Sequence, residues 1–134
     1  KSNNMTEKTR YSDEELMEFK DLILQKMEVA KKNYDDLMAV LMNKSGNSVD
    51  DTSPSYKVME EGYNTQSKDE LTALAARQQK FIKSLQAALV RIENKTYGIC
   101  RVTGKLIPKE RLRAVPHATL SIEAKEMMNK NQNH

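Results

Sequence analysis

The chain has 134 residues, of which 31% are charged and only 5% aromatic, with no Trp, 4 Gly and 3 Pro. This composition favours a single domain of long, solvated helices and excludes a thick core built on large side chains. The net charge of +3 is too small to indicate a nucleic-acid partner by itself, and the single cysteine excludes an intramolecular disulfide.

The ends and the hydropathy of the chain bear on where it works. No apolar run approaches the ~20 residues that a membrane-spanning helix needs, and the N-terminus lacks an apolar signal core. We therefore expect a cytoplasmic protein without a membrane partner. Met5 has the context of a native start, which would make residues 1–4 an added segment, and residues 1–11 are expected to be a flexible N-terminus.

The first predicted helix covers residues 12–42. It opens with a capping box, in which Ser12 and Glu15 can each satisfy a backbone donor of the first turn. Apolar residues then follow a spacing typical of a coiled-coil seam, which Lys20 interrupts. They are Leu16, Ile23, Met27, Ala30, Tyr34, Leu37 and Leu41.

The second predicted helix covers residues 67–94 and begins with another capping box, Ser67 with Glu70. Its seam is again spaced by three and four residues: Leu71, Leu74, Gln78, Phe81, Leu85, Ala88 and Ile92. Two seams of matched length in one chain predict an antiparallel hairpin, residues 12–94, because local pairing loses less entropy than association. We therefore expect a monomer; the alternative is an oligomer that pairs the seams of separate chains.

Acidic residues gather in the connection between the two helices, residues 43–66, which would form the tip of the hairpin. Residues 50–70 contain six acids and two bases, which gives a net charge of −4. The acids expected at the tip are Asp50, Asp51, Glu60 and Glu61. A loop of this length in a compact domain is typically functional or disordered.

Residues 95–134 have a different character and are expected to form a small domain that ends in a short helix. "YGICRVTGKLIP" predicts a short hairpin with Gly104 in its turn. Residues 95–113 contain six bases and one acid, which gives a net charge of +5. These bases predict a charged surface: Lys95, Arg101, Lys105, Lys109, Arg111 and Arg113.

A metal-binding pattern is visible in this domain, but it is incomplete. The template C-x2-C-x17-C-x2-C of a structural zinc site falls on Cys100, Thr103, Ser121 and Ala124, so only one cysteine remains. We therefore expect no metal cofactor, and we expect Cys100 to pack as a small apolar side chain. The apolar cluster expected around it comprises Ile99, Val102, Leu106, Ile107, Leu112, Val115, Leu120 and Ile122.

The run from "RIENKTYGIC" through "TG", "IP" and "RL" to "IEAK", residues 91–125, resembles the C-terminal finger of the DksA/TraR family, the C4-type zinc-finger regulators of bacterial RNA polymerase. The resemblance implies a mostly α fold, with a long coiled-coil hairpin, a zinc-finger-like knuckle and a short C-terminal helix. It also implies a hairpin tip that enters the secondary channel of RNA polymerase and modulates initiation, with ppGpp as an effector. The family's tip motif, D-x-x-D-x-A, is not present as such.

The sequence bears on three functional classes. An enzyme is not expected, because two histidines and one thiol cannot supply a nucleophile, a base and a group to orient it. A polymerase-binding transcription regulator agrees best with a long rod that carries acids at its tip. The alternatives are electrostatic binding of nucleic acid by the basic knuckle, with Tyr97 as its one aromatic neighbour, and a coiled-coil adaptor unrelated to polymerase.

Overall fold

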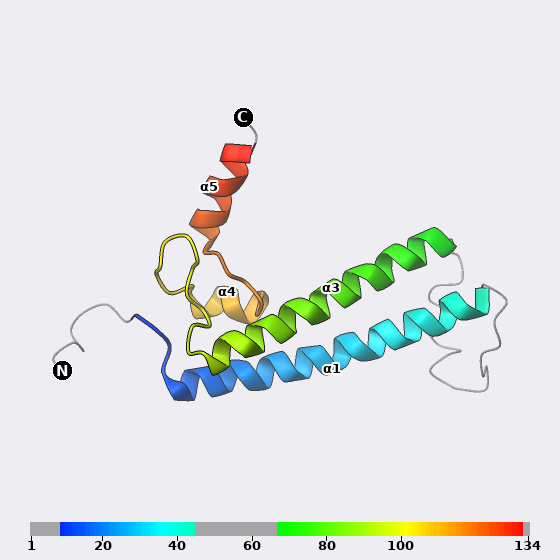
Figure 1. The fold of residues 1–134 in the computed structure, drawn as a ribbon, viewed down its shortest axis with the longest axis horizontal. Coiled ribbons are helices and arrows are strands. Elements are labelled where there is room, and N and C mark those ends of the chain that lie inside the picture. Colours follow the sequence, from blue (N-terminus) through cyan, green and yellow to red (C-terminus); the bar gives the residue numbers. More distant parts are fainter. Residues whose placement is uncertain (1–8, 45–66, 133–134) are drawn as a thin grey trace. The chain divides into compact units, whose positions relative to one another are not determined.

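The computed structural model describes residues 9–44 and 67–132. Its helices are α1 (Asp13–Lys44), α3 (Lys68–Glu93), α4 (Lys109–Ala114) and α5 (Ile122–Gln132) (Figure 1). The predicted acidic tip, with Asp50, Asp51, Glu60 and Glu61, lies outside these ranges. The predicted helices at residues 12–42 and 67–94 agree with α1 and α3 to within two residues.

Contacts divide the chain into two compact units, residues 1–25 with 84–134 and residues 26–83. We call the first the finger unit and the second the rod unit. Each unit contains a part of α1 and a part of α3. In both units these parts run in opposite directions, so the predicted antiparallel hairpin and the mostly α fold class are confirmed.

In the rod unit, the end of α1 packs against the beginning of α3. The core there consists of Leu37, Val40, Leu71 and Ala75, which are all buried. Tyr34 and Leu41, which the sequence placed in the seam, are only half-buried and pack at its side, while Val40 takes the buried place. The spacing of the seam was therefore predicted correctly, but the residues predicted to be buried near the end of α1 were partly wrong.

Both long helices begin at the predicted capping boxes. The Ser12 hydroxyl accepts a hydrogen bond from the Glu15 backbone N–H at 3.1 Å, and Glu15 Oε1 accepts one from the Ser12 N–H at 2.8 Å. Ser67 and Glu70 repeat the arrangement at 3.1 and 2.7 Å. These bonds satisfy backbone donors that have no partner inside a helix.

Replacing Ser67 with alanine is expected to lower the free energy of unfolding by about 1 kcal/mol, because a first-turn N–H of α3 loses its acceptor. Replacement with glycine should cost only a few tenths of a kcal/mol. Urea unfolding followed by far-ultraviolet circular dichroism measures both. Equal losses for the two variants would contradict the capping role.

In the finger unit, α3 ends with a left-handed residue. Lys95 has a φ of 65°, the Thr96 N–H donates to the Arg91 carbonyl at 2.9 Å, and the Lys95 N–H donates to the Ile92 carbonyl at 3.1 Å. This pattern is a helix C-terminal cap in which lysine occupies the position usually held by glycine. Gly98, a second residue with a left-handed backbone, lies three residues further on, with a φ of 80°.

The core of the finger unit is made from distant parts of the chain. The rings of Tyr11, Phe19 and Tyr97 pack in series, with centroids 5.7 and 5.3 Å apart. Tyr97 is fully buried and its hydroxyl donates to the Pro116 carbonyl at 2.7 Å. Tyr11, which we had assigned to the flexible N-terminus, is buried as well.

Candidate functional site

The knuckle predicted at residues 97–108 is a tight loop closed by backbone hydrogen bonds. An isolated antiparallel bridge joins Ile99 to Leu106, and the Cys100 N–H donates to the Lys105 carbonyl at 2.8 Å. The Gly104 N–H returns to the Cys100 carbonyl at 2.8 Å. The predicted hairpin with Gly104 in its turn is therefore present as one bridge and no longer ladder.

The loop brings the predicted zinc positions together around the Cys100 sulfur. Cys100 is buried, and its Sγ accepts the backbone N–H groups of Thr103 at 3.5 Å and Ser121 at 3.4 Å. Burial raises the pKa of the Cys100 thiol, but the hydrogen bonds from Thr103, Ser121 and Val102 outweigh it and lower the pKa to about 6. Cys100 is packed, as the sequence indicated, and it is also strongly hydrogen-bonded.

The side chains at the other three zinc-site positions, Thr103, Ser121 and Ala124, form hydrogen bonds or are buried. The Ser121 hydroxyl accepts the Ala124 N–H at 3.1 Å, which makes Ser121 the N-cap of α5. The Thr103 hydroxyl accepts the Lys105 N–H at 3.2 Å. Ala124 is fully buried beneath them.

The spacing of these positions suits a metal, whereas their donor atoms do not. Cys100 Sγ lies 3.8 Å from Ser121 Oγ, close to the edge of about 3.8 Å expected for a tetrahedron with Zn–S bonds of about 2.3 Å. One sulfur, two engaged hydroxyls and a methyl group do not make a four-cysteine site. In the described residues, no three His, Cys, Asp or Glu side chains gather where they could hold a metal ion.

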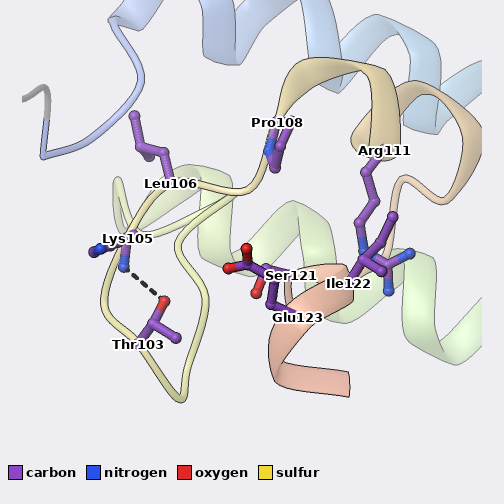
Figure 2. A pocket seen from close by; sticks show the side chains of 8 residues that line it. All are labelled: Thr103, Lys105, Leu106, Pro108, Arg111, Ser121, Ile122 and Glu123. Carbon is purple, nitrogen blue, oxygen red and sulfur yellow. Dashed lines mark hydrogen bonds between the residues drawn. The ribbon is translucent and has the colours of Figure 1, made fainter. Parts of the chain in front are cut away.

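A pocket of about 320 Å³ opens beside these positions, between the knuckle loop and the beginning of α5. Figure 2 shows Ser121 and Glu123 on the side of α5 that faces the loop, whereas the Arg111 side chain extends from α4 toward Ile122. Because Lys105, Arg111 and Glu123 all contribute to its wall, the pocket has no uniform charge. Its lining does not single out one class of ligand.

Two of the six predicted surface bases form ion pairs with the beginning of α1. Lys95 Nζ lies 2.9 Å from Asp13 Oδ1, and Lys109 Nζ lies 2.7 Å from Glu15 Oε2. The hydrogen bond from Lys95 lowers the pKa of the Asp13 carboxyl, and the bond to Glu15 raises the pKa of Lys109. Sequence reasoning missed Asp13 and Glu15, because nothing in their local pattern points to bases more than eighty residues away.

The other bases have different surroundings. Arg101, Lys105 and Arg113 are exposed, whereas the Arg111 Nε donates to the Leu120 carbonyl at 2.7 Å. Tyr97, the one aromatic residue that could have stacked on a base, is fully buried. Binding of nucleic acid by stacking therefore has no support in this part of the chain.

The chain is similar to proteins of known family and structure. A family model, the prokaryotic dksA/traR C4-type zinc finger, matches residues 95–126. The structure of the transcription factor DksA2 from Pseudomonas aeruginosa matches 89% of this chain and 86% of that chain, with a TM-score of 0.70 and 28% sequence identity. Residues 95–126 therefore match the zinc finger of the DksA/TraR family, and the fold of the chain resembles that of DksA2.

Curated relatives match over a short stretch. The RNA polymerase-binding transcription factor DksA of Caulobacter vibrioides is 48% identical to this chain over 50 residues. This stretch covers 37% of this chain and 35% of that protein. YteA of Bacillus subtilis is 47% identical over 51 residues. This stretch covers 38% of this chain and 21% of that protein. The chain thus spans well under half the length of these relatives.

The match to the family model corrects the prediction about cofactors. We expected no metal cofactor, and the match to a C4-type zinc finger contradicts that expectation, because zinc binding belongs to the finger that residues 95–126 represent. The residues of this chain keep the arrangement of such a finger with a reduced set of donor atoms. We therefore assign no step of the function to a metal.

None of the helices within residues 9–44 and 67–132 combines the length and the apolar character that crossing a bilayer requires.

Proposed function

We propose that this chain binds RNA polymerase and regulates transcription, as its DksA relative is named for doing. The likeness to DksA2 over 89% of the chain carries this proposal, because it includes the hairpin as well as the finger. The 48% identity to DksA of Caulobacter vibrioides supports it independently.

We further propose that the hairpin acts as a rod whose tip enters the secondary channel of the polymerase. The 32 residues of α1 correspond to a rod of about 48 Å, long enough to reach a catalytic centre through a narrow pore. Carboxylates at the tip would attract a catalytic Mg²⁺, its ligands or the basic residues of mobile elements. The effector ppGpp and a monomeric state belong to the same proposal.

The acids proposed for this contact are Asp50, Asp51, Glu60 and Glu61, which lie outside the described residues. Changing the four to Asn and Gln is expected to weaken binding to core RNA polymerase at least tenfold, since each neutral amide loses the charge attraction. Titration of fluorescently labelled protein with polymerase, with and without ppGpp and a competing secondary-channel factor, measures this loss.

A matched control removes the same number of charges from exposed acids on α1. Glu14, Asp21, Glu28 and Asp35 are exposed, and their conversion to amides should leave the affinity within about twofold. Equal losses for the two variants would reject the role of the tip. Failure of the unsubstituted chain to bind polymerase would reject the proposed function as a whole.

A further inference from the structure

The two ion pairs of the finger unit enclose the knuckle from both ends. Lys95 precedes the knuckle and pairs with Asp13, while Lys109 opens α4 just after the knuckle and pairs with Glu15. Both acids belong to the first turn of α1. Residues 11–15, which we call the N-terminal clasp, therefore contact the basic surface at two points.

The clasp is attached by Tyr11 rather than by its charges. The buried Tyr11 ring packs on Phe19 and faces Gly98, and its hydroxyl donates a hydrogen bond to the Ile107 carbonyl. By contrast, the Asp13 and Lys95 side chains are 66% and 51% exposed, and Glu15 and Lys109 are 16% and 37% exposed. The exposed Asp13–Lys95 pair adds little stability, and the Lys109 side chain is exposed enough to leave Glu15, so both pairs can open while Tyr11 stays in place.

What these pairs change is the charge that the surface presents. Asp13 and Glu15 cancel the charges of Lys95 and Lys109, and an anionic partner must displace them before it can use those lysines. The group already bound to each lysine is a carboxylate, at 2.9 and 2.7 Å. Burial of Tyr97 removes the stacking contact that a nucleic acid would use.

We propose that the N-terminal clasp is an internal competitor for an acidic protein surface at Lys95 and Lys109. When an acidic partner docks on the finger, its carboxylates replace those of Asp13 and Glu15 at Lys95 and Lys109, while Glu15 Oε1 keeps its hydrogen bond from the Ser12 N–H. The binding of such partners is thereby weakened in the free protein. The proposal stands apart from polymerase binding, because any acidic protein surface can test it.

The test uses the full chain with Asp13→Asn and Glu15→Gln, and poly-L-glutamate as the probe. Glutamine at position 15 keeps an oxygen for the capping box, so α1 should still begin correctly. The control, Glu14→Gln with Asp21→Asn, removes two exposed acids from the same region of α1 and gives the same net charge. We expect the clasp variant to bind poly-L-glutamate about three- to tenfold more tightly at low salt, and the control less than twofold more tightly.

Further variants make the outcome decisive. Adding Lys95→Gln and Lys109→Gln to the clasp variant should abolish the gain, and Asp13→Asn alone, which alters the more exposed pair, should give part of it. Acylation followed by mass spectrometry should find Lys95 and Lys109 more reactive in the clasp variant than in the unsubstituted chain. Equal gains for clasp and control variants, or a gain for a DNA duplex without one for poly-L-glutamate, would overturn the proposal.

Discussion

Replacing Gly98 with alanine is expected to destabilise the finger unit by about 2.5–5 kcal/mol. Gly98 has a φ of 80°, where an L-residue with a Cβ costs about 1–2 kcal/mol. An added Cβ would lie 2.7 Å from the Tyr11 ring and 3.2 Å from a Leu112 methyl group. The ring would have to leave its buried site, which forfeits a further ~1.5–3 kcal/mol of apolar burial.

Gly104 provides the matched control. Its φ of 74° is nearly the same, but no atom lies within 4 Å of an added Cβ. Alanine at position 104 should therefore cost only about 1–2 kcal/mol, the backbone contribution alone. Urea unfolding followed by the near-ultraviolet circular dichroism of tyrosine reports both changes, and equal losses would show that contact with Tyr11 is unimportant.

Restoring the missing cysteines is expected to give a tight zinc site. A variant with Thr103→Cys, Ser121→Cys and Ala124→Cys would have four thiolates at the zinc-site positions. In the unsubstituted chain only the Cys100 sulfur is present there, and it accepts hydrogen bonds from the backbone N–H groups of Thr103 and Ser121. Structural zinc sites bind with free energies on the order of 10 kcal/mol, so the variant should gain zinc affinity over the unsubstituted chain and unfold at a much higher temperature when zinc is present.

Competition with a chromogenic chelator measures the affinity, and thermal unfolding with and without zinc measures the stabilisation. The control adds Cys100→Ser to the same three changes, which leaves three thiolates and should lower the affinity markedly. If the control binds zinc as tightly as the variant, Cys100 does not belong to the reconstructed site. If neither gains affinity, the four positions do not retain the geometry of a zinc finger.

The hairpin could be predicted from sequence because its pattern is periodic. Capping boxes fixed the beginnings of α1 and α3, and steps of three and four residues identified buried side chains such as Ile23, Leu71 and Leu85. Such a pattern extends over many turns. The prediction of Leu41 instead of Val40 as the buried residue near the end of α1 therefore did not change the predicted fold.

The finger could be predicted only in outline, since its short irregular segments have no period. Val102 and Ile122, which we expected in its apolar cluster, are 48% and 55% exposed. Burial falls instead on small side chains such as Ala118 and Ala124, which fill spaces that a sequence does not reveal. The prediction that the chain has no metal cofactor rested on a count of cysteines, and the match of residues 95–126 to a C4-type zinc finger contradicts it.

The hydrogen bond from Tyr11 to Ile107 spans 96 positions of the chain, and this separation affects the order of folding. A ribosome completes α1 and α3 before it adds the residues that accept Tyr11. A hairpin of local contacts can form early, whereas contacts between distant residues form slowly because a long loop must first close. Completion of the finger therefore waits until Gly98, Ile107 and Leu112 have been added, and a nascent chain that stops before residue 98 would leave the Tyr11 ring without these contacts.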